Sequence, residues 1–189
     1  MASRVGILAL QGGFEAHAKI LRALGAEPRE VRVPDHLEGL DALIIPGGES
    51  TVMTLGIERE QLAAPLRDLI ARGTPVLGTC AGMIMLDRDH LGLLDVRAER
   101  NAFGRQLRSF EADIELNGID GGPLRAVFIR APWISERGEG VSVLAELDGH
   151  PVAVRQGNVI AVAFHPELAG EPRLHELLLG LDRAPAEPA

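Results

Sequence analysis

The chain has 189 residues, of which 46% are hydrophobic and 24% charged, and this composition excludes a disordered protein and fits a globular one. Its 19 basic and 27 acidic residues leave a formal charge of −8, and the basic residues are scattered, which argues against a nucleic-acid partner. Cys80 is the only cysteine, which excludes an internal disulfide and any site built from several cysteines, and we expect neither a metal nor a cofactor.

The first half of the chain predicts strands that alternate with helices. Residues 5–10 form a short apolar run typical of a strand buried on both faces, and residues 14–24 carry apolar side chains at helical spacing. Further along, we predict strands at residues 30–33, 40–45 and 75–77 and a helix at residues 61–72. This order and spacing indicate an α/β fold with a mainly parallel central sheet.

The second half predicts additional antiparallel strands. Alternating or apolar segments suited to strands lie at residues 109–116, 126–129, 141–147, 151–154 and 159–164. The segment Gln-Gly-Asn at residues 156–158 is typical of the turn that joins two hairpin strands. A last short helix is expected at residues 174–181. The added strands would extend or flank the parallel core.

No linker or internal repeat divides the chain, so we expect a single domain over residues 1–183 and a short flexible tail over residues 184–189. No apolar run approaches the length of a membrane-spanning helix, and the N-terminal run is interrupted by Gln11 and two glycines. Together with the single cysteine, these features favour a reducing compartment, and we expect the cytoplasm.

Cys80 lies between a predicted buried strand and a predicted helix, with Gly78 and Gly82 two residues to either side. This arrangement is the sulfur counterpart of the nucleophile elbow, a sharp strand-to-helix turn that strains its central residue and excludes bulky neighbours. The helix N-terminus favours a thiolate and a nearby oxyanion. A buried core thiol is the alternative, but the two flanking glycines favour a nucleophile.

A cysteine nucleophile needs a base, and His165 closes an apolar strand two residues before a carboxylate, Glu167. In an extended segment, residues i and i+2 project to the same side. Glu167 would therefore orient the ring of His165 while the other ring nitrogen faces Cys80. His-Pro-Glu alone fits an ordinary exit from a strand, but together with the cysteine elbow it predicts a catalytic triad.

A third strand end carries the segment Pro-Gly-Gly-Glu-Ser at residues 46–50. Paired glycines let backbone amides approach a ligand, which suits an oxyanion hole, although such a segment also occurs as a plain turn. Ligands of open α/β sheets gather beyond the carboxyl ends of the strands. We therefore expect the three strand-end segments to meet there.

The segments at residues 46–50, 78–82 and 165–167 resemble the signatures of the class I (triad) glutamine amidotransferases. Within that family, the chain resembles the glutaminase subunit of pyridoxal 5'-phosphate synthase in further segments. These segments lie at residues 8–12, 99–106, 109–113 and 128–132. The resemblance runs in one order from residue 5 to residue 168. It implies a three-layer, flavodoxin-like α/β fold.

This resemblance also implies an activity and a partner. The expected reaction is hydrolysis of L-glutamine to L-glutamate and ammonia. The ammonia would pass through a protein tunnel to a synthase subunit that makes pyridoxal 5'-phosphate from ribose 5-phosphate and glyceraldehyde 3-phosphate. Glutaminase subunits would sit on a core of synthase subunits, with no nucleic acid or membrane involved.

Carried onto this sequence, the resemblance implies that Cys80 is the nucleophile, His165 the acid and base, and Glu167 the orienting carboxylate. The backbone amides of Gly48 and Ala81 would form the oxyanion hole. Contacts to glutamine would come from Gly48, Glu49, Ser50, Arg100, Ile129 and Arg130. Arg100 offers a cation for a carboxylate of the amino acid, and a surface salt bridge is its alternative role.

The chain departs from the family near its start. Family members usually have a glutamate directly before a histidine in this region, and here Ala16 precedes His17. We expect His17 to lie on the surface of its helix, with a role at the partner interface as the alternative.

Other functions remain open from the residues alone. They are a glutaminase for another biosynthetic acceptor, a stand-alone cysteine hydrolase or peptidase of related fold, and a non-catalytic module that keeps the fold. The complete set of Cys80, His165 and Glu167 argues against the last of these.

Overall fold

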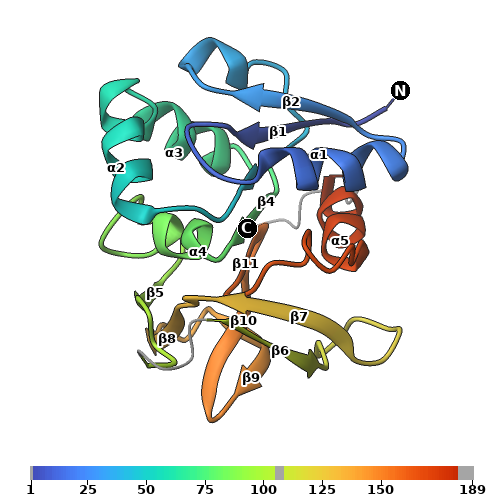
Figure 1. Ribbon diagram of the computed structural model, residues 1–189. Coiled ribbons are helices and arrows are strands. Elements are labelled where there is room, and N and C mark those ends of the chain that lie inside the picture. The colour runs from blue at the N-terminus through green and yellow to red at the C-terminus, as the bar shows by residue number, and fades with distance from the viewer. Residues whose placement is uncertain (1, 105–108, 183–189) are drawn as a thin grey trace.

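The computed structural model describes residues 2–104 and 109–182, and its centre is a seven-stranded sheet (Figure 1). The strand order in this sheet is β2-β1-β3-β4-β11-β10-β9. The bounds of these strands are β1 (Arg4–Leu8), β2 (Glu27–Val31), β3 (Ala42–Ile45), β4 (Val76–Thr79), β9 (Ser142–Leu147), β10 (His150–Gln156) and β11 (Val159–Val162).

The sheet is parallel from β2 to β11 and antiparallel at its other end. β1 pairs with β2 and β3, and β4 pairs with β3 and β11, all in parallel. β10 pairs antiparallel with both β11 and β9, and the hairpin between β10 and β11 turns at Gly157 and Asn158, as expected. The prediction of a mainly parallel sheet with added antiparallel strands is confirmed.

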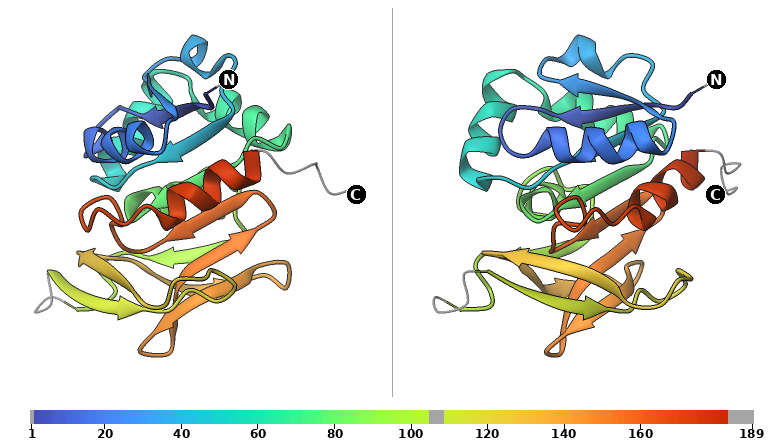
Figure 2. Two further views of the ribbon diagram at one scale, coloured as in Figure 1. Left: turned by 90° about the vertical axis from the view of Figure 1, so that its right-hand side faces the viewer. Right: turned by 45° about the vertical axis from the view of Figure 1, so that its right-hand side comes forward.

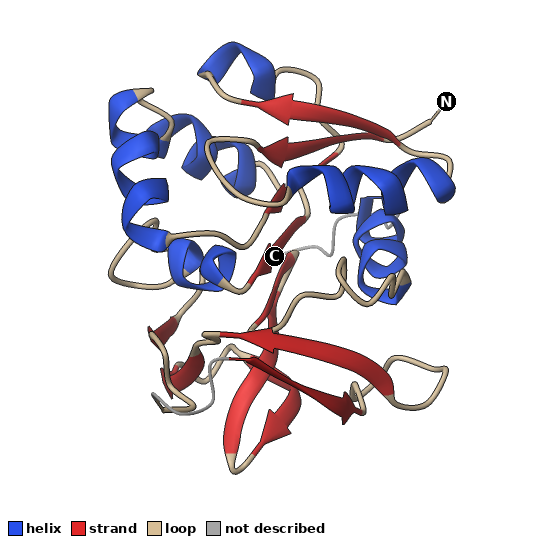
Figure 3. Cartoon of the chain, in the orientation of Figure 1, coloured by secondary structure: helices blue, strands red, loops and turns tan. Residues whose placement is uncertain are grey.

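Helices cover both faces of the sheet and give three layers (Figure 3). α1 and α5 lie on one side of the strands, and α2, α3 and α4 lie on the other (Figure 1). Their bounds are α1 (Phe14–Ala23), α2 (Ser50–Arg59), α3 (Ala63–Ala71), α4 (Ala81–Leu86) and α5 (Arg173–Asp182), and a 3-10 turn, η1, spans Pro34–Leu37. The three-layer arrangement agrees with the fold that the family resemblance implies.

Two small antiparallel sheets lie beside the β9 end of the main sheet (Figure 2). They are formed by β5 (Val96–Glu99) with β8 (Trp133–Arg137) and by β6 (Ser109–Ile114) with β7 (Leu124–Ile129). Phe110 of β6 stacks on Phe128 of β7 with ring centroids 4.7 Å apart, and Phe164, just after β11, packs edge-on against Phe128. This aromatic contact fixes β7 next to the carboxyl end of β11.

One predicted strand is displaced in the structure, and four observed elements were not predicted. The strand expected at residues 30–33 lies at Glu27–Val31, because its parallel pairing with β1 sets the bounds of this exposed edge strand. The sequence patterns did not predict α2, β5, β8 or η1. In α2, Gly56 and the β-branched residues Thr51, Val52 and Thr54 lower helix propensity, and the helix is instead capped by Glu49, whose carboxylate accepts from the Val52 amide at 3.3 Å.

No helix within residues 2–104 and 109–182 is long and apolar enough to cross a membrane. Residue 183 and the predicted tail at residues 184–189 lie outside the described residues, as do residues 105 and 106 of one family-like segment. The predicted domain boundary therefore stays a prediction.

Candidate active site

Cys80 occupies the single-residue turn between β4 and α4. Its backbone has φ 50° and ψ −108°, a conformation that costs a non-glycine residue about 1–3 kcal/mol. The Cys80 amide donates to the Val162 carbonyl at 2.8 Å and so continues the pairing of β4 with β11. The sheet thus holds the strained residue in place, as the nucleophile-elbow interpretation expects.

The glycines on either side of Cys80 allow α4 to lie directly against the sheet. A Cβ atom at Gly82 would strike the carbonyl oxygen of Ile45 in β3. A Cβ atom at Gly78 would lie 2.8 Å from the carbonyl oxygen of Gly82. Larger residues at either position would push the start of α4, and Cys80 with it, away from the strands.

His165 leaves β11 beside the end of β7, where its amide donates to the Val127 carbonyl at 2.8 Å. Its Nδ1 lies 2.7 Å from Oε1 of Glu167, and the side chain of Glu167 is only 3% exposed. Gly47 marks the meeting point with the thiol, because a Cβ atom there would strike the His165 ring and lie 3.3 Å from Cβ of Cys80. The structure therefore brings together the three residues of the predicted triad.

The charges of this group support one another. Burial alone would lower the pKa of His165, but its hydrogen bonds with Cys80 and Glu167 and their charges outweigh burial and raise the pKa to about 10. Burial would raise the pKa of Glu167, but its hydrogen bond with His165 and its electrostatic interactions with the rings of His17 and His165 outweigh burial and lower it. The favoured state at neutral pH is an imidazolium held by a carboxylate.

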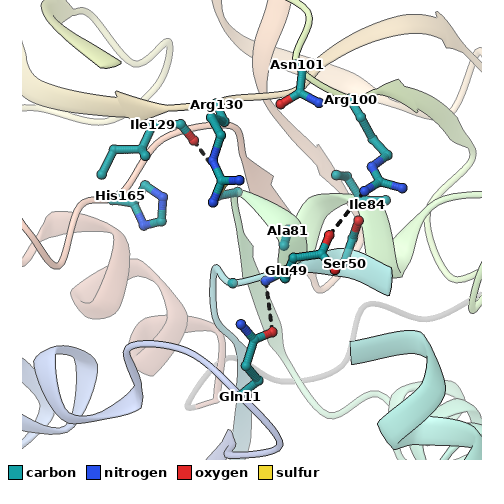
Figure 4. Close-up of a pocket in the computed structure, with 12 residues that line it drawn as sticks. Gln11, Glu49, Ser50, Ala81, Ile84, Arg100, Asn101, Ile129, Arg130 and His165 are labelled. Atoms are coloured by element: carbon teal, nitrogen blue, oxygen red, sulfur yellow. Dashed lines mark hydrogen bonds and ion pairs between the residues drawn. The ribbon is translucent and has the colours of Figure 1, made fainter. Parts of the chain in front are cut away.

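Cys80 lies in the wall of a cavity of about 330 Å³, and Figure 4 shows the side chains of other residues that line it. The cavity is lined by Gln11, Gly48, Glu49, Ser50, Cys80, Ala81, Ile84, Arg100, Asn101, Ile129, Arg130 and His165. Every predicted site residue lines it except Glu167, which lies behind His165. No role was predicted from the sequence for Gln11, Ile84 or Asn101, although Gln11 and Asn101 lie in the segments at residues 8–12 and 99–106 that resemble the family.

The side chain of Gln11 holds the turn at residues 46–50 in place. Its Oε1 accepts from the Glu49 amide at 2.9 Å, and Figure 4 shows Glu49 between Gln11 and Arg100. Gly12 has φ 95°, and a Cβ atom there would strike the Gly47 carbonyl oxygen. The loop after β1 and the turn after β3 therefore touch through their backbones, and Gln11 sets the orientation of the peptide that follows Gly48.

Arg100 and Arg130 reach the cavity from the second half of the chain. Arg100 Nη2 lies 3.1 Å from Oε1 of Glu49, and both side chains are partly exposed. Arg130 follows β7 with φ 44°, and the preceding carbonyl of Ile129 accepts from the Cys80 Sγ at 3.7 Å. The cavity thus has cationic groups at its rim and the thiol in its wall.

Nothing in the described part of the chain gathers three or more His, Cys, Asp or Glu side chains in a way that would hold a metal ion. The cavity offers a nucleophile, a proton carrier, backbone amides and charged groups at the rim. This set suits acyl transfer from a small, doubly charged amide substrate.

The expectation that His17 lies on the helix surface is wrong. Its side chain is fully buried, with Nδ1 2.9 Å from Nε2 of His175 and Nε2 3.5 Å from Oε2 of Glu167. The helical spacing of the sequence could have predicted the burial of His17, because His17 shares the inward face of α1 with Ala18 and Leu21.

Comparison with known proteins identifies relatives along almost the whole chain. A pyridoxal 5'-phosphate synthase subunit PdxT from Mycolicibacterium vanbaalenii is 50% identical over 190 residues, which cover 94% of this chain and 97% of that protein. One of the same name from Frankia alni is 48% identical over 190 residues and covers 96% of each chain.

A solved structure agrees with these relatives. A crystal structure of a glutamine amidotransferase matches with a TM-score of 0.89 and 48% identity, and the match covers 95% of this chain and 99% of that one. The family described as the SNO glutamine amidotransferase family matches residues 7–180. The resemblance that the motifs predicted, and the fold it implied, are confirmed: this chain belongs to the SNO glutamine amidotransferase family.

Proposed function

We propose that this protein is the glutaminase subunit of a pyridoxal 5'-phosphate synthase, which hydrolyses L-glutamine to L-glutamate and ammonia for a synthase subunit. The activity is supported by the family, and the synthase by the name shared by relatives that match this chain over 94–97% of its length. One observation carries the mechanism: the thiol of Cys80 and the ring of His165 meet in the wall of the cavity with Glu167 behind them.

The reaction proceeds in two steps. The Cys80 thiolate attacks the side-chain carboxamide carbon of glutamine and forms a C–S bond. Collapse of the tetrahedral intermediate breaks the C–N bond, and the imidazolium of His165 donates its proton to the departing amino group, which leaves as ammonia. Water then attacks the γ-glutamyl thioester while His165 takes up its proton. The C–S bond breaks, glutamate is released, and the Cys80 thiolate and the imidazolium of His165 are restored. Glu167 keeps the ring oriented and stabilises its charge.

The tetrahedral oxyanion needs donors, because a carboxamide is a poor electrophile. The backbone amides of Gly48 and Ala81 are the proposed pair, and each such donor contributes roughly 3–4 kcal/mol. Ala81 is the first residue of α4, where backbone amides have no intrahelical acceptor. Gln11 supports Gly48 by holding the next peptide in place.

The charged ends of glutamine bind at the rim of the cavity. Arg100 is the proposed partner of the α-carboxylate, and Glu49 is close enough to Arg100 to bind the neighbouring ammonium group. Ser50, Ile129 and Arg130 line the rest of the cavity and are the remaining proposed contacts.

The partner docks on the face that surrounds this site, with glutaminase subunits arranged on a core of synthase subunits. Three large hydrophobic side chains are exposed in the described residues, and each follows a site residue closely in sequence: Val52, Leu55 and Leu168. A tunnel for ammonia would begin at the cavity. We expect the complex in the cytoplasm, where reducing conditions keep Cys80 as a thiol.

A glutamine-like diazo-ketone tests the proposed nucleophile directly. With the synthase subunit added, we expect a covalent adduct on Cys80 by mass spectrometry, no adduct in Cys80→Ala, and much slower labelling in His165→Asn. His36→Asn changes an exposed histidine outside the cavity and serves as the control, with labelling as in the wild type. Absence of an adduct on the wild-type protein in the presence of the partner would contradict the assignment.

A further inference from the structure

A buried polar cluster lies behind the triad, on the side of Glu167 that faces away from the cavity. It consists of His17 from α1, His175 from α5 and Thr79 from β4, and all three side chains belong to fully buried residues. His17 Nδ1 lies 2.9 Å from His175 Nε2, and Thr79 Oγ1 lies 3.4 Å from His17 Nε2. The reaction described above uses none of these groups.

Glu167 has one oxygen that the triad leaves without a strong partner. Oε1 binds His165 at 2.7 Å, whereas Oε2 has no well-formed hydrogen bond among the described residues. The side chain facing Oε2 is His17, whose Nε2 lies 3.5 Å away. A buried carboxylate that must stay charged needs donors on both oxygens, so the histidine behind it has a physical task.

We propose that His17 is a positioning residue of the glutaminase site, which donates from Nε2 to Oε2 of Glu167 and is held in that tautomer by His175. The inference rests on the proposed function, since it assigns His17 a role through the orienting carboxylate. It adds to the triad a chain of contacts that starts in α5, crosses α1 and ends at the thiol.

The tautomers follow from the neighbouring groups. Burial lowers the pKa of both His17 and His175, that of His175 to about 3, so both rings are neutral and each carries one N–H. The charged or titratable groups that face the two rings are Glu167, His165 and Glu171. If His175 donates from Nε2 to His17 Nδ1, the hydrogen of His17 must lie on Nε2, toward the carboxylate. The opposite tautomers would place a ring lone pair against a negative oxygen.

For catalysis, the hydrogen bond from His17 would keep Glu167 ionised and fixed in its orientation. A donor on Oε2 keeps Oε1 directed at His165 and keeps the carboxylate negative, and that charge in turn keeps the imidazole protonated. Without the donor, Glu167 is harder to ionise in its buried site, and His165 loses its proton at a lower pH. Binding of glutamine at the rim of the cavity is unaffected, because none of the cluster lines it.

Three substitutions of His17 separate this role from simple packing. In His17→Gln the amide nitrogen can stand near the place of Nε2, in His17→Asn it stands near Nδ1, and His17→Leu has no donor. With synthase present, we expect Asn and Leu to lower kcat for glutamine hydrolysis about 10- to 100-fold with KM unchanged, and Gln to restore most of the rate. His36→Gln, an exposed histidine, is the matched control and should equal the wild type.

The second readout is ¹⁵N NMR of histidine-labelled protein, which does not depend on activity. In the wild type we expect the proton of neutral His17 on Nε2, and we expect the pKa of His165 to fall in His17→Asn and His17→Leu but not in His17→Gln. A wild-type His17 protonated on Nδ1 overturns the proposal even if no variant folds. Equal loss of activity in all three variants with an unchanged pKa of His165 overturns it as well, and shows a packing role.

These outcomes differ from a failure of the proposed function. If the wild-type protein with its partner neither hydrolyses glutamine nor takes up the diazo-ketone label, the glutaminase assignment fails. If the wild type is active and His17→Leu matches it in kcat and in the pKa of His165, only the inference about His17 fails.

Discussion

Arg100 and Glu49 already form an ion pair in the structure, with 3.1 Å between Nη2 and Oε1, and Arg100 also reaches Thr51 Oγ1 at 3.4 Å. A bound amino acid carries both charges of this pair within one molecule. Binding of glutamine would therefore break the Arg100–Glu49 ion pair. Arg100 would then pair with the α-carboxylate of glutamine, and Glu49 with its ammonium group. The exchange keeps each charge paired, so the empty site and the occupied site are both electrostatically satisfied.

Arg100→Gln tests this exchange. Because the proposed role of Arg100 is to bind the end of the substrate that does not react, we expect KM for glutamine to rise about 10- to 100-fold with kcat changed by less than about threefold. Steady-state glutaminase kinetics with the synthase subunit present measure both constants. Arg32→Gln removes a similar exposed arginine, paired with Glu30 outside the cavity, and should change neither. A fall in kcat at unchanged KM would assign Arg100 to the reaction instead of to binding.

The residues of the proposed triad could be located in the sequence because short-range patterns mark them. A glycine on each side of Cys80 indicates the turn, and the spacing of His165 and Glu167 in an extended segment indicates their pairing. Asn101 gave no such signal, because tertiary packing brings it to the cavity. Gln11 directly follows the predicted strand at residues 5–10, and this place beyond a strand end is the signal that could have found it. His17 contradicts the expectation drawn from its polarity, because its place on the apolar face of α1 buries it.

Among the elements, α4 depends most on close packing. It lies against β3 and β4, and the space for its backbone exists only because Gly82 and Gly78 have no side chains. A helix in this position carries Cys80 at its N-cap. Any residue that lifts the helix also moves the thiol away from His165, so stability and activity are coupled at this contact.

Gly82→Ala should lower the free energy of unfolding by about 1–3 kcal/mol, because the new methyl group strikes the carbonyl of Ile45. Gly180→Ala in α5 is the matched control: a Cβ atom there meets nothing within 4 Å, and alanine favours helix by about 0.5–1 kcal/mol. Urea unfolding followed by circular dichroism measures both. Equal stability of the two variants would mean that α4 does not depend on this close approach.

The strands of the core were easier to predict than the helices that cover them. β3, β4 and β11 are fully buried and appear in the sequence as short apolar runs, which few other structures produce. α2 has no comparable signal, since it begins inside a glycine turn and contains Gly56. β5 and β8 form a two-stranded sheet, and their partly exposed side chains show no clean alternation.

The order of the parallel strands explains why distant residues share one cavity. β1, β3, β4 and β11 are successive parallel neighbours, so their carboxyl ends lie side by side. These ends lead to Gln11, Gly48, Cys80 and His165, in the same order. The β6–β7 pair then closes the cavity by placing Ile129 and Arg130 beside the thiol.

The same assembly buries two neutral histidines, and this makes the stability of the molecule sensitive to acid. Burial lowers the pKa of His175 to about 3, whereas an unfolded histidine has a pKa near 6.5. Between these values the unfolded chain binds a proton that the folded chain does not bind, so the free energy of unfolding falls as the pH falls. For His175 the loss reaches about 2 kcal/mol by pH 5, and His17 acts in the same direction.

His175→Gln removes this titration. Between pH 7.5 and pH 5, the free energy of unfolding should fall by about 2 kcal/mol less in the variant than in the wild type. This difference does not depend on how stable the variant is at neutral pH. The difference between the two curves isolates His175, because His165 titrates in both proteins and Glu167, with its lowered pKa, titrates below this range. Urea unfolding at several pH values measures the difference, and His36→Gln should reproduce the wild-type curve. Parallel curves for His175→Gln and the wild type would show that the buried pair takes up protons in the folded state, and the neutral tautomers assigned to it would be wrong.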